Sequence, residues 1–134
     1  MKQKKAVILC VDDDVTILNT LKTQLKNVFA DTYGYEMAEN ATDALEIIEE
    51  LNEENATILL IVSDWLMPGM KGDEFLIQVH HEFPNIIKIM LTGHADEAAV
   101  KRAVEQANLF CCLYKPLNTE DLIKTIQSSL DTHG

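Results

Sequence analysis

The chain has 134 residues, of which 47% are hydrophobic and 25% are charged. This is the balance of an ordinary globular protein with room for one domain and one core. Its formal net charge of −11, from 22 acidic and 11 basic residues, argues against direct binding to nucleic acid. No apolar run approaches the ~20 residues that span a bilayer, and the apolar stretch near Met1 is too short for a signal peptide. We therefore expect a cytoplasmic protein without membrane contact.

Five short runs predict strands, the second more weakly because it contains Gly34, and they alternate with five stretches in which apolar residues recur at helical spacing. The predicted strands are Ala6–Val11, Tyr33–Ala38, Ile58–Val62, Ile86–Leu91 and Leu109–Tyr114. The alternation predicts an α/β fold, a doubly wound five-stranded parallel sheet with helices on both faces. We expect one domain over residues 1–134, with tails at 1–5 and 131–134.

Polar residues stand where the predicted helices begin. Asp14 is well placed as the N-cap of the first helix, Asn40 or Thr42 caps the second, and Asp96 begins the fourth. Pro84 closes the third helix. Thr119-Glu120-Asp121 opens the fifth helix, so each predicted helix has a local reason to start or stop where the apolar pattern does.

The stretch Ser63–Gly72 follows the third strand, which carries five apolar residues in a row and ends at Asp64. Pro68, Gly69 and Gly72 then predict a loop before the next helix. An aspartate at a strand end is more often a cap or turn residue than a reactive group. In an open α/β sheet, however, ligands bind at the carboxyl ends of the strands.

Four strand ends carry chemically useful side chains: Asp12 and Asp13, Asp64, Thr92, and Lys115. In a parallel sheet these ends meet at one edge. Three carboxylates at one edge repel one another and need a cation to stay ionised together. Hard oxygen ligands favour Mg²⁺ or Mn²⁺. A carboxylate nucleophile, a divalent metal, a hydroxyl and an ammonium group are the parts needed to place a phosphoryl group on an aspartate.

The motifs around these ends resemble those of the receiver domains of two-component response regulators, in a chemotaxis-regulator-like form. They are Val11–Asp14, Ser63–Gly72, Leu91–Gly93 and Tyr114–Pro116, within a resemblance that runs from Val7 to about Leu130. The resemblance implies a flavodoxin-like sheet with strand order 2-1-3-4-5. It also implies a role for six residues: Asp64 as phosphoacceptor, Thr92 and Lys115 at the phosphoryl oxygens, and Mg²⁺ held by Asp12, Asp13, Asp64 and the backbone carbonyl of Leu66.

The resemblance further implies the partners. A sensor histidine kinase or a histidine phosphotransfer protein would supply the phosphoryl group. An output domain, a partner protein or a second copy of the chain would dock on the face of the fourth helix, fifth strand and fifth helix. Such a domain assists its own phosphorylation and dephosphorylation without being a turnover enzyme. Since the sequence contains no recognisable output domain, it represents a single-domain regulator or part of a longer protein.

Two other functions compete with this interpretation. The spacing Asp12-x-Asp14-x-Thr16 fits the first motif of haloacid-dehalogenase-type phosphatases, in which Asp12 would be the nucleophile. That hypothesis leaves Asp64 without a role, and no acidic pair follows a strand after Lys115. The other alternative is a receiver-like interaction scaffold that is never phosphorylated, against which the complete set of acceptor residues argues.

Two positions depart from the family pattern. The family often has Gly at the start of the fifth strand, where this chain has Asn108, a mild change because Asn tolerates left-handed geometry. The family usually carries Tyr or Phe three residues before the lysine, where this chain has Cys112. Strand alternation predicts that Phe110, Cys112 and Tyr114 share one face of the fifth strand. The acceptor chemistry is unaffected, but the way in which the signal leaves the site is changed.

Overall fold

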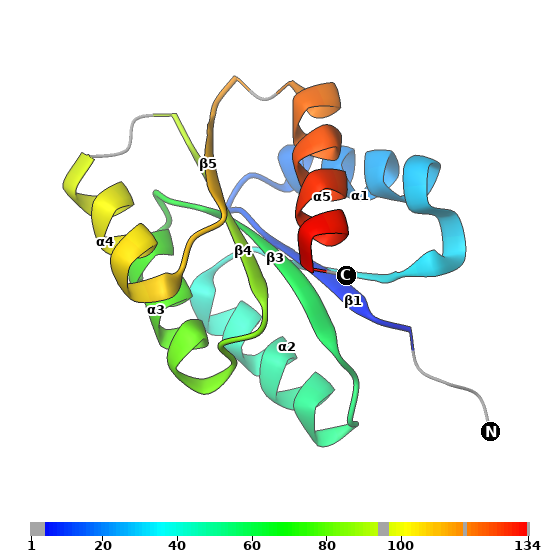
Figure 1. The fold of residues 1–134 in the computed structure, drawn as a ribbon, viewed down its shortest axis with the longest axis horizontal. Coiled ribbons are helices and arrows are strands. Elements are labelled where there is room, and N and C mark those ends of the chain that lie inside the picture. The colour runs from blue at the N-terminus through cyan, green and yellow to red at the C-terminus, as the bar shows by residue number, and fades with distance from the viewer. Residues whose placement is uncertain (1–4, 94–96, 117, 134) are drawn as a thin grey trace.

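The computed structural model describes residues 5–93, 97–116 and 118–133, which form one sheet with helices on both faces (Figure 1). The elements are β1 (Val7–Val11), α1 (Val15–Phe29), the 3-10 turn η1 (Ala30–Thr32), β2 (Gly34–Ala38), α2 (Ala41–Glu53), β3 (Ile58–Asp64), α3 (Gly72–Glu82), β4 (Ile87–Thr92), α4 (Glu97–Ala107), β5 (Cys111–Tyr114) and α5 (Thr119–His133). The strands are parallel in the order β2-β1-β3-β4-β5, which confirms the predicted fold.

Two separate cores lie on the two faces of the sheet. Helices α1 and α5 cover one face, and α2, α3 and α4 cover the other (Figure 1). Successive residues of a strand point to opposite faces, so Ile8 enters the α1/α5 core while Leu9 enters the α2–α4 core. All five residues of β1 are buried, because a strand covered on both sides has no solvent face to supply with polar residues.

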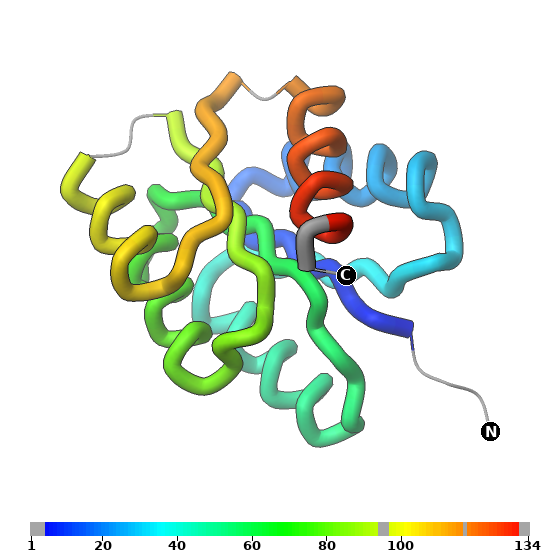
Figure 2. Tube along the Cα trace, in the orientation of Figure 1, coloured from blue at the N-terminus to red at the C-terminus, as the bar shows by residue number. Residues whose placement is uncertain are grey.

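The carboxyl ends of parallel strands share one edge of this sheet. In Figure 2, β4 and β5 run in the same direction and end at the upper edge of the molecule. Side chains that directly follow these strands are therefore brought together. None of the described helices is long and apolar enough to cross a membrane.

Local capping explains where two of the helices start. Asp14 accepts a hydrogen bond from the backbone N–H of Thr16 at 2.9 Å, and Asn40 accepts one from that of Asp43 at 2.8 Å. Both N-cap predictions are confirmed, the second in favour of Asn40. The predicted cap Asp96 lies outside the described residues.

The last strand and helix differ from the prediction. Strand β5 begins at Cys111, not Leu109, and Asn108, which precedes both, adopts a left-handed conformation with φ 52°. The side chain of Phe110 consequently enters the α1/α5 core, whereas Cys112 packs against the opposite core. The prediction that these two residues share a face is therefore wrong. Helix α5 also continues to His133, into the stretch expected to be a tail.

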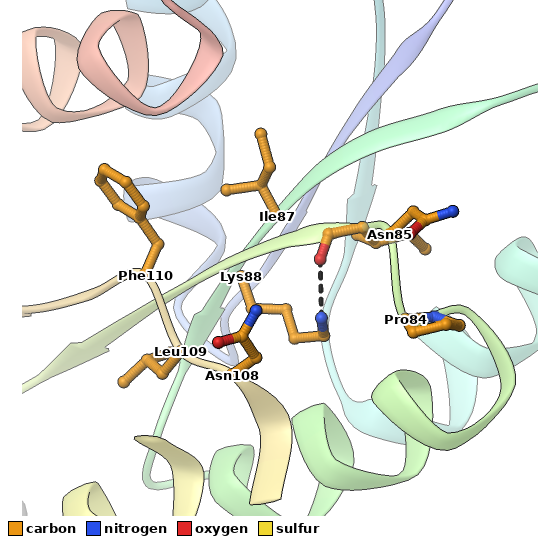
Figure 3. Close-up of a pocket in the computed structure, with 8 residues that line it drawn as sticks. Pro84, Asn85, Ile87, Lys88, Asn108, Leu109 and Phe110 are labelled. Carbon is orange, nitrogen blue, oxygen red and sulfur yellow. Dashed lines mark hydrogen bonds between the residues drawn. The ribbon is translucent and has the colours of Figure 1, made fainter. Parts of the chain in front are cut away.

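Strand β4 carries a buried lysine at the opposite edge of the sheet from Asp64. Lys88 is 1% exposed and donates a hydrogen bond of 2.7 Å from Nζ to the carbonyl of Ile86. Beside it is a cavity of about 490 Å³, lined by residues 84–88 and 108–110 (Figure 3). Burial lowers the pKa of Lys88 to about 8. The cavity lies where β4 and β5 begin, so it does not belong to the carboxylate edge.

Replacing this lysine by methionine should stabilise the fold at neutral pH. The unfolded chain holds the proton up to a pKa of 10.5, and the folded chain releases it near 8, so wild-type stability rises with pH between these values. We expect Lys88→Met to raise the free energy of unfolding at pH 7 by about 1–2 kcal/mol. The gain should shrink toward pH 10 in urea titrations. A constant difference at every pH, or the same gain in the exposed control Lys124→Met, would contradict this.

Candidate functional site

Three carboxylates gather where the order of the sheet reverses, between β1 and β3. Asp12 and Asp13 directly follow β1, and Asp64 is the last residue of β3. One carboxylate oxygen from each lies within 4.8 Å of those of the other two. Asp12 and Asp64 are buried, whereas Asp13 is exposed. The cluster predicted from the strand ends is thus present, at the point of an open α/β sheet where ligands bind.

Lys115 reaches this cluster from the end of β5. Its Nζ lies 3.0 Å from Oδ2 of Asp12 and 3.1 Å from Oδ1 of Asp64. Its backbone N–H donates to the carbonyl of Thr92 at 2.8 Å. The ammonium group of Lys115 thus joins the ends of β1 and β3, and its backbone joins the end of β4.

The carboxylates of this site repel one another, and Lys115 offsets only part of that repulsion. Burial and then the negative charge of Asp12 raise the pKa of Asp64 to about 6, although Lys115 partly offsets them. Burial would lower the pKa of Lys115, but its hydrogen bond to Asp12 and the charges of Asp12 and Asp64 raise it above its usual value. One ammonium group does not neutralise three carboxylates, so the cluster retains an affinity for a further cation.

Asp12 is held in place by the backbone. Its N–H donates to the carbonyl of Ala38 at 3.1 Å, and its Oδ1 accepts the N–H of Asp14 at 2.9 Å. Its other oxygen takes the bond from Lys115. Asp14 caps α1 and is exposed, as expected for the member of the triplet that lies outside the site.

The loop after Asp64 is anchored at both ends. The N–H of Trp65 donates to the carbonyl of Leu91 at 2.8 Å, and the N–H of Gly72 donates to the carbonyl of Trp65 at 2.7 Å. Met67 is buried in the α2–α4 core. The side chain of Leu66 is exposed, two residues beyond Asp64. Thr92 is buried at the end of the neighbouring strand β4.

Two residues near the site did not emerge from the sequence. Asp73, in the first turn of α3, accepts hydrogen bonds from Nε1 of Trp65 and from the guanidinium group of Arg102 on α4. A charged residue three positions before Leu76 lies on the buried stripe of its helix, which is the one signal that could have indicated Asp73. No local pattern indicates Arg102.

A sequence profile of the response regulator receiver domain matches residues 8–127. The chain belongs to this family. Receiver domains act in two-component signalling by accepting a phosphoryl group on aspartate, and the acidic cluster fits such a phosphoacceptor site. Clusters of this kind bind Mg²⁺ in the family. The match favours neither the phosphatase nor the scaffold alternative.

Individual relatives agree with this assignment. The chemotaxis protein CheY1 of Helicobacter pylori is 28% identical over 94% of this chain and 98% of its own. A CheY-like receiver domain protein from Methanospirillum hungatei superposes with a TM-score of 0.84, at 32% identity and 97% coverage of both chains. The hydrogenase transcriptional regulatory protein HoxA of Cupriavidus necator is 26% identical over the whole of this chain, which spans 26% of the length of HoxA.

The loop between Asp64 and Gly72 (residues 65–71) is called the acceptor loop below. The close contact between Gly72 and the backbone of Asp64 and Trp65 can be tested by substitution. A Cβ atom at Gly72 would clash with the carbonyl oxygen of Asp64 and lie 2.8 Å from Cα of Trp65. Both are backbone atoms, so α3 would have to move. We expect Gly72→Ala to lower the free energy of unfolding by about 1–3 kcal/mol. In the control Gly93→Ala the new Cβ would meet Lys115 Cβ at an ordinary 4.0 Å. Equal stability of the two variants would contradict the close approach.

Proposed function

We propose that Asp64 accepts a phosphoryl group from a phosphohistidine of a kinase or phosphotransfer protein. A carboxylate oxygen of Asp64 attacks phosphorus, the phosphorus–nitrogen bond breaks, and the imidazole leaves with the electron pair and takes up a proton. The product is an acyl phosphate on Asp64. The observation that supports this role best is that Asp64 ends a buried strand within 3.1 Å of the ammonium group of Lys115.

The surrounding residues have separate roles in this proposal. Asp12, Asp13, Asp64 and the backbone carbonyl of Leu66 would hold Mg²⁺, which when bound neutralises the charge that gathers during transfer. Lys115, oriented by its bond to Asp12, would contact a phosphoryl oxygen as a mobile positive charge. Thr92, at the end of the adjacent strand, would contact another.

The same proposal extends to the chain as a whole. Residues 1–134 would form a single receiver domain that acts in the cytoplasm and binds neither membrane nor nucleic acid. It would assist its own phosphorylation and dephosphorylation without being a turnover enzyme. An output domain, a partner or a second copy would dock on the face of α4, β5 and α5, where Val104 and Tyr114 are exposed.

Acetyl phosphate with Mg²⁺ should add one phosphoryl group to the native protein. Mass spectrometry of the intact protein measures this addition. We expect Asp64→Asn to remain unlabelled, because its side chain lacks the nucleophilic oxygen. EDTA should abolish labelling of the native protein. Equal labelling of Asp64→Asn, or labelling that survives EDTA, would overturn the assignment, and mapping the label to Asp12 would instead support the phosphatase alternative.

Mg²⁺ should stabilise the fold by occupying the carboxylate cluster. A ligand present at ~100 times its dissociation constant adds about 2.7 kcal/mol to the free energy of unfolding when it binds the folded state alone. We expect the melting temperature to rise with millimolar Mg²⁺ in the native protein and to be unresponsive in Asp13→Asn. Asp14→Asn removes the same charge one residue further along and still caps α1, so this control should respond like the native protein. An equal response in both variants would exclude the cluster as the binding site.

A further inference from the structure

A hydrogen-bonded link joins the backbone beside Asp64 to α4. Trp65 follows Asp64 directly, and its Nε1 donates to Oδ1 of Asp73 at 3.0 Å. Arg102 donates to the other oxygen, Oδ2, from Nε at 3.1 Å and from Nη2 at 2.9 Å. One carboxylate on α3 is thus shared by the acceptor loop and by a helix that begins more than thirty residues after Asp64.

The burial of Asp73 makes this link costly to break. Its side chain is 2% exposed, whereas that of Arg102 is 48% exposed. Without Arg102 this buried carboxylate would keep only the hydrogen bond from Trp65 and no positive charge, within the part of the chain that the structure describes. Truncating one partner of such a pair is usually far more damaging than losing a surface pair. Among the described residues, Arg102 is the only cation within ion-pair distance of Asp73.

The apolar packing of α4 is weak enough for this link to matter. The buried residues of α4 are Ala99, Ala103 and Ala107, and alanine removes little apolar area from water. Helix α3, by contrast, buries Phe75, Leu76 and Val79. Helix α4 therefore depends on polar contacts for its position more than its neighbour does.

Trp65 connects this link to the acceptor itself. Its N–H is bonded to β4 and its carbonyl to the first residue of α3, so its backbone is fixed on both sides. The ammonium group of Lys71 lies 5.2 Å from the centre of its ring. The residue that directly follows Asp64 thus also bonds, through its indole N–H, to the carboxylate that pairs with Arg102 of α4.

We propose that Asp73 is a positioning residue that ties α4 to the acceptor loop, so that phosphorylation of Asp64 and the mobility of α4 are coupled through Trp65 and Arg102. The coupling rests on the proposed function of Asp64. Linkage makes it reciprocal: a variant that frees α4 must also change the affinity of the site for a phosphoryl mimic. Asp73 itself need not touch the phosphoryl group.

Hydrogen exchange of the α4 amides, with and without Mg²⁺ and beryllium fluoride, tests the proposal. We expect Arg102→Gln to speed α4 exchange by about tenfold without the mimic and to lose the response of α4 to the mimic. Asp73→Asn, which keeps an oxygen for Trp65 but loses the ion pair, should do the same, and the double variant should add nothing. Lys101→Gln and Glu74→Gln remove neighbouring exposed charges and should behave like the native protein.

Separate measurements distinguish the ways in which the idea can fail. Absence of acetyl phosphate labelling in the native protein would overturn the proposed function. Normal labelling and mimic binding, combined with an α4 response in Arg102→Gln equal to that in Lys101→Gln, would overturn the coupling alone. If Arg102→Gln does not fold, Trp65→Phe carries the same test, since it keeps a ring and removes the N–H donor. An unchanged α4 response in that variant would then refute the link.

Discussion

Two buried carboxylates beside each other, at the point where the sheet order reverses, are the constraint on which the rest of the site depends. Asp12 and Asp64 are both excluded from water, and an arrangement of this kind is unfavourable unless positive charge is supplied. Lys115, which follows the outermost strand β5, supplies part of that positive charge. The parallel order makes this geometry available, because all five strands have their carboxyl ends on the same side of the sheet and four of them contribute residues to the site. The fold thus holds the carboxylate of Asp64 beside another buried negative charge, and a bound cation would reduce the repulsion between them.

Much of this arrangement was predictable from local patterns. Apolar runs and helical stripes gave the five strands and five helices, and strand ends gave the carboxylate cluster. The strand order and the roles of individual residues came from the family resemblance. Pairings that are distant in sequence left no such trace. Asp73 and Arg102 are 29 residues apart, and their contact depends on how α3 packs beside α4.

The error at Phe110 has a specific physical origin. Alternation predicts the face of a residue only within a continuous strand. Asn108 turns the chain through a left-handed conformation, so Leu109 and Phe110 precede β5. Phe110 then packs with Leu113 in the α1/α5 core. As a result, Tyr114, which is 64% exposed, is the aromatic residue of β5 left on the face of Cys112.

The helices of the two cores bury side chains of different size. Helices α1 and α5 bury leucines and isoleucines against the sheet, which fixes that side by apolar packing. On the other side, α4 buries alanines and the neighbouring strand position is the small Cys112. Local opening is easiest where few apolar contacts must be lost. Helix α4 therefore has the smallest apolar anchor of the helices on its face, and the carboxylate of Asp73 bonds it to the loop that follows Asp64.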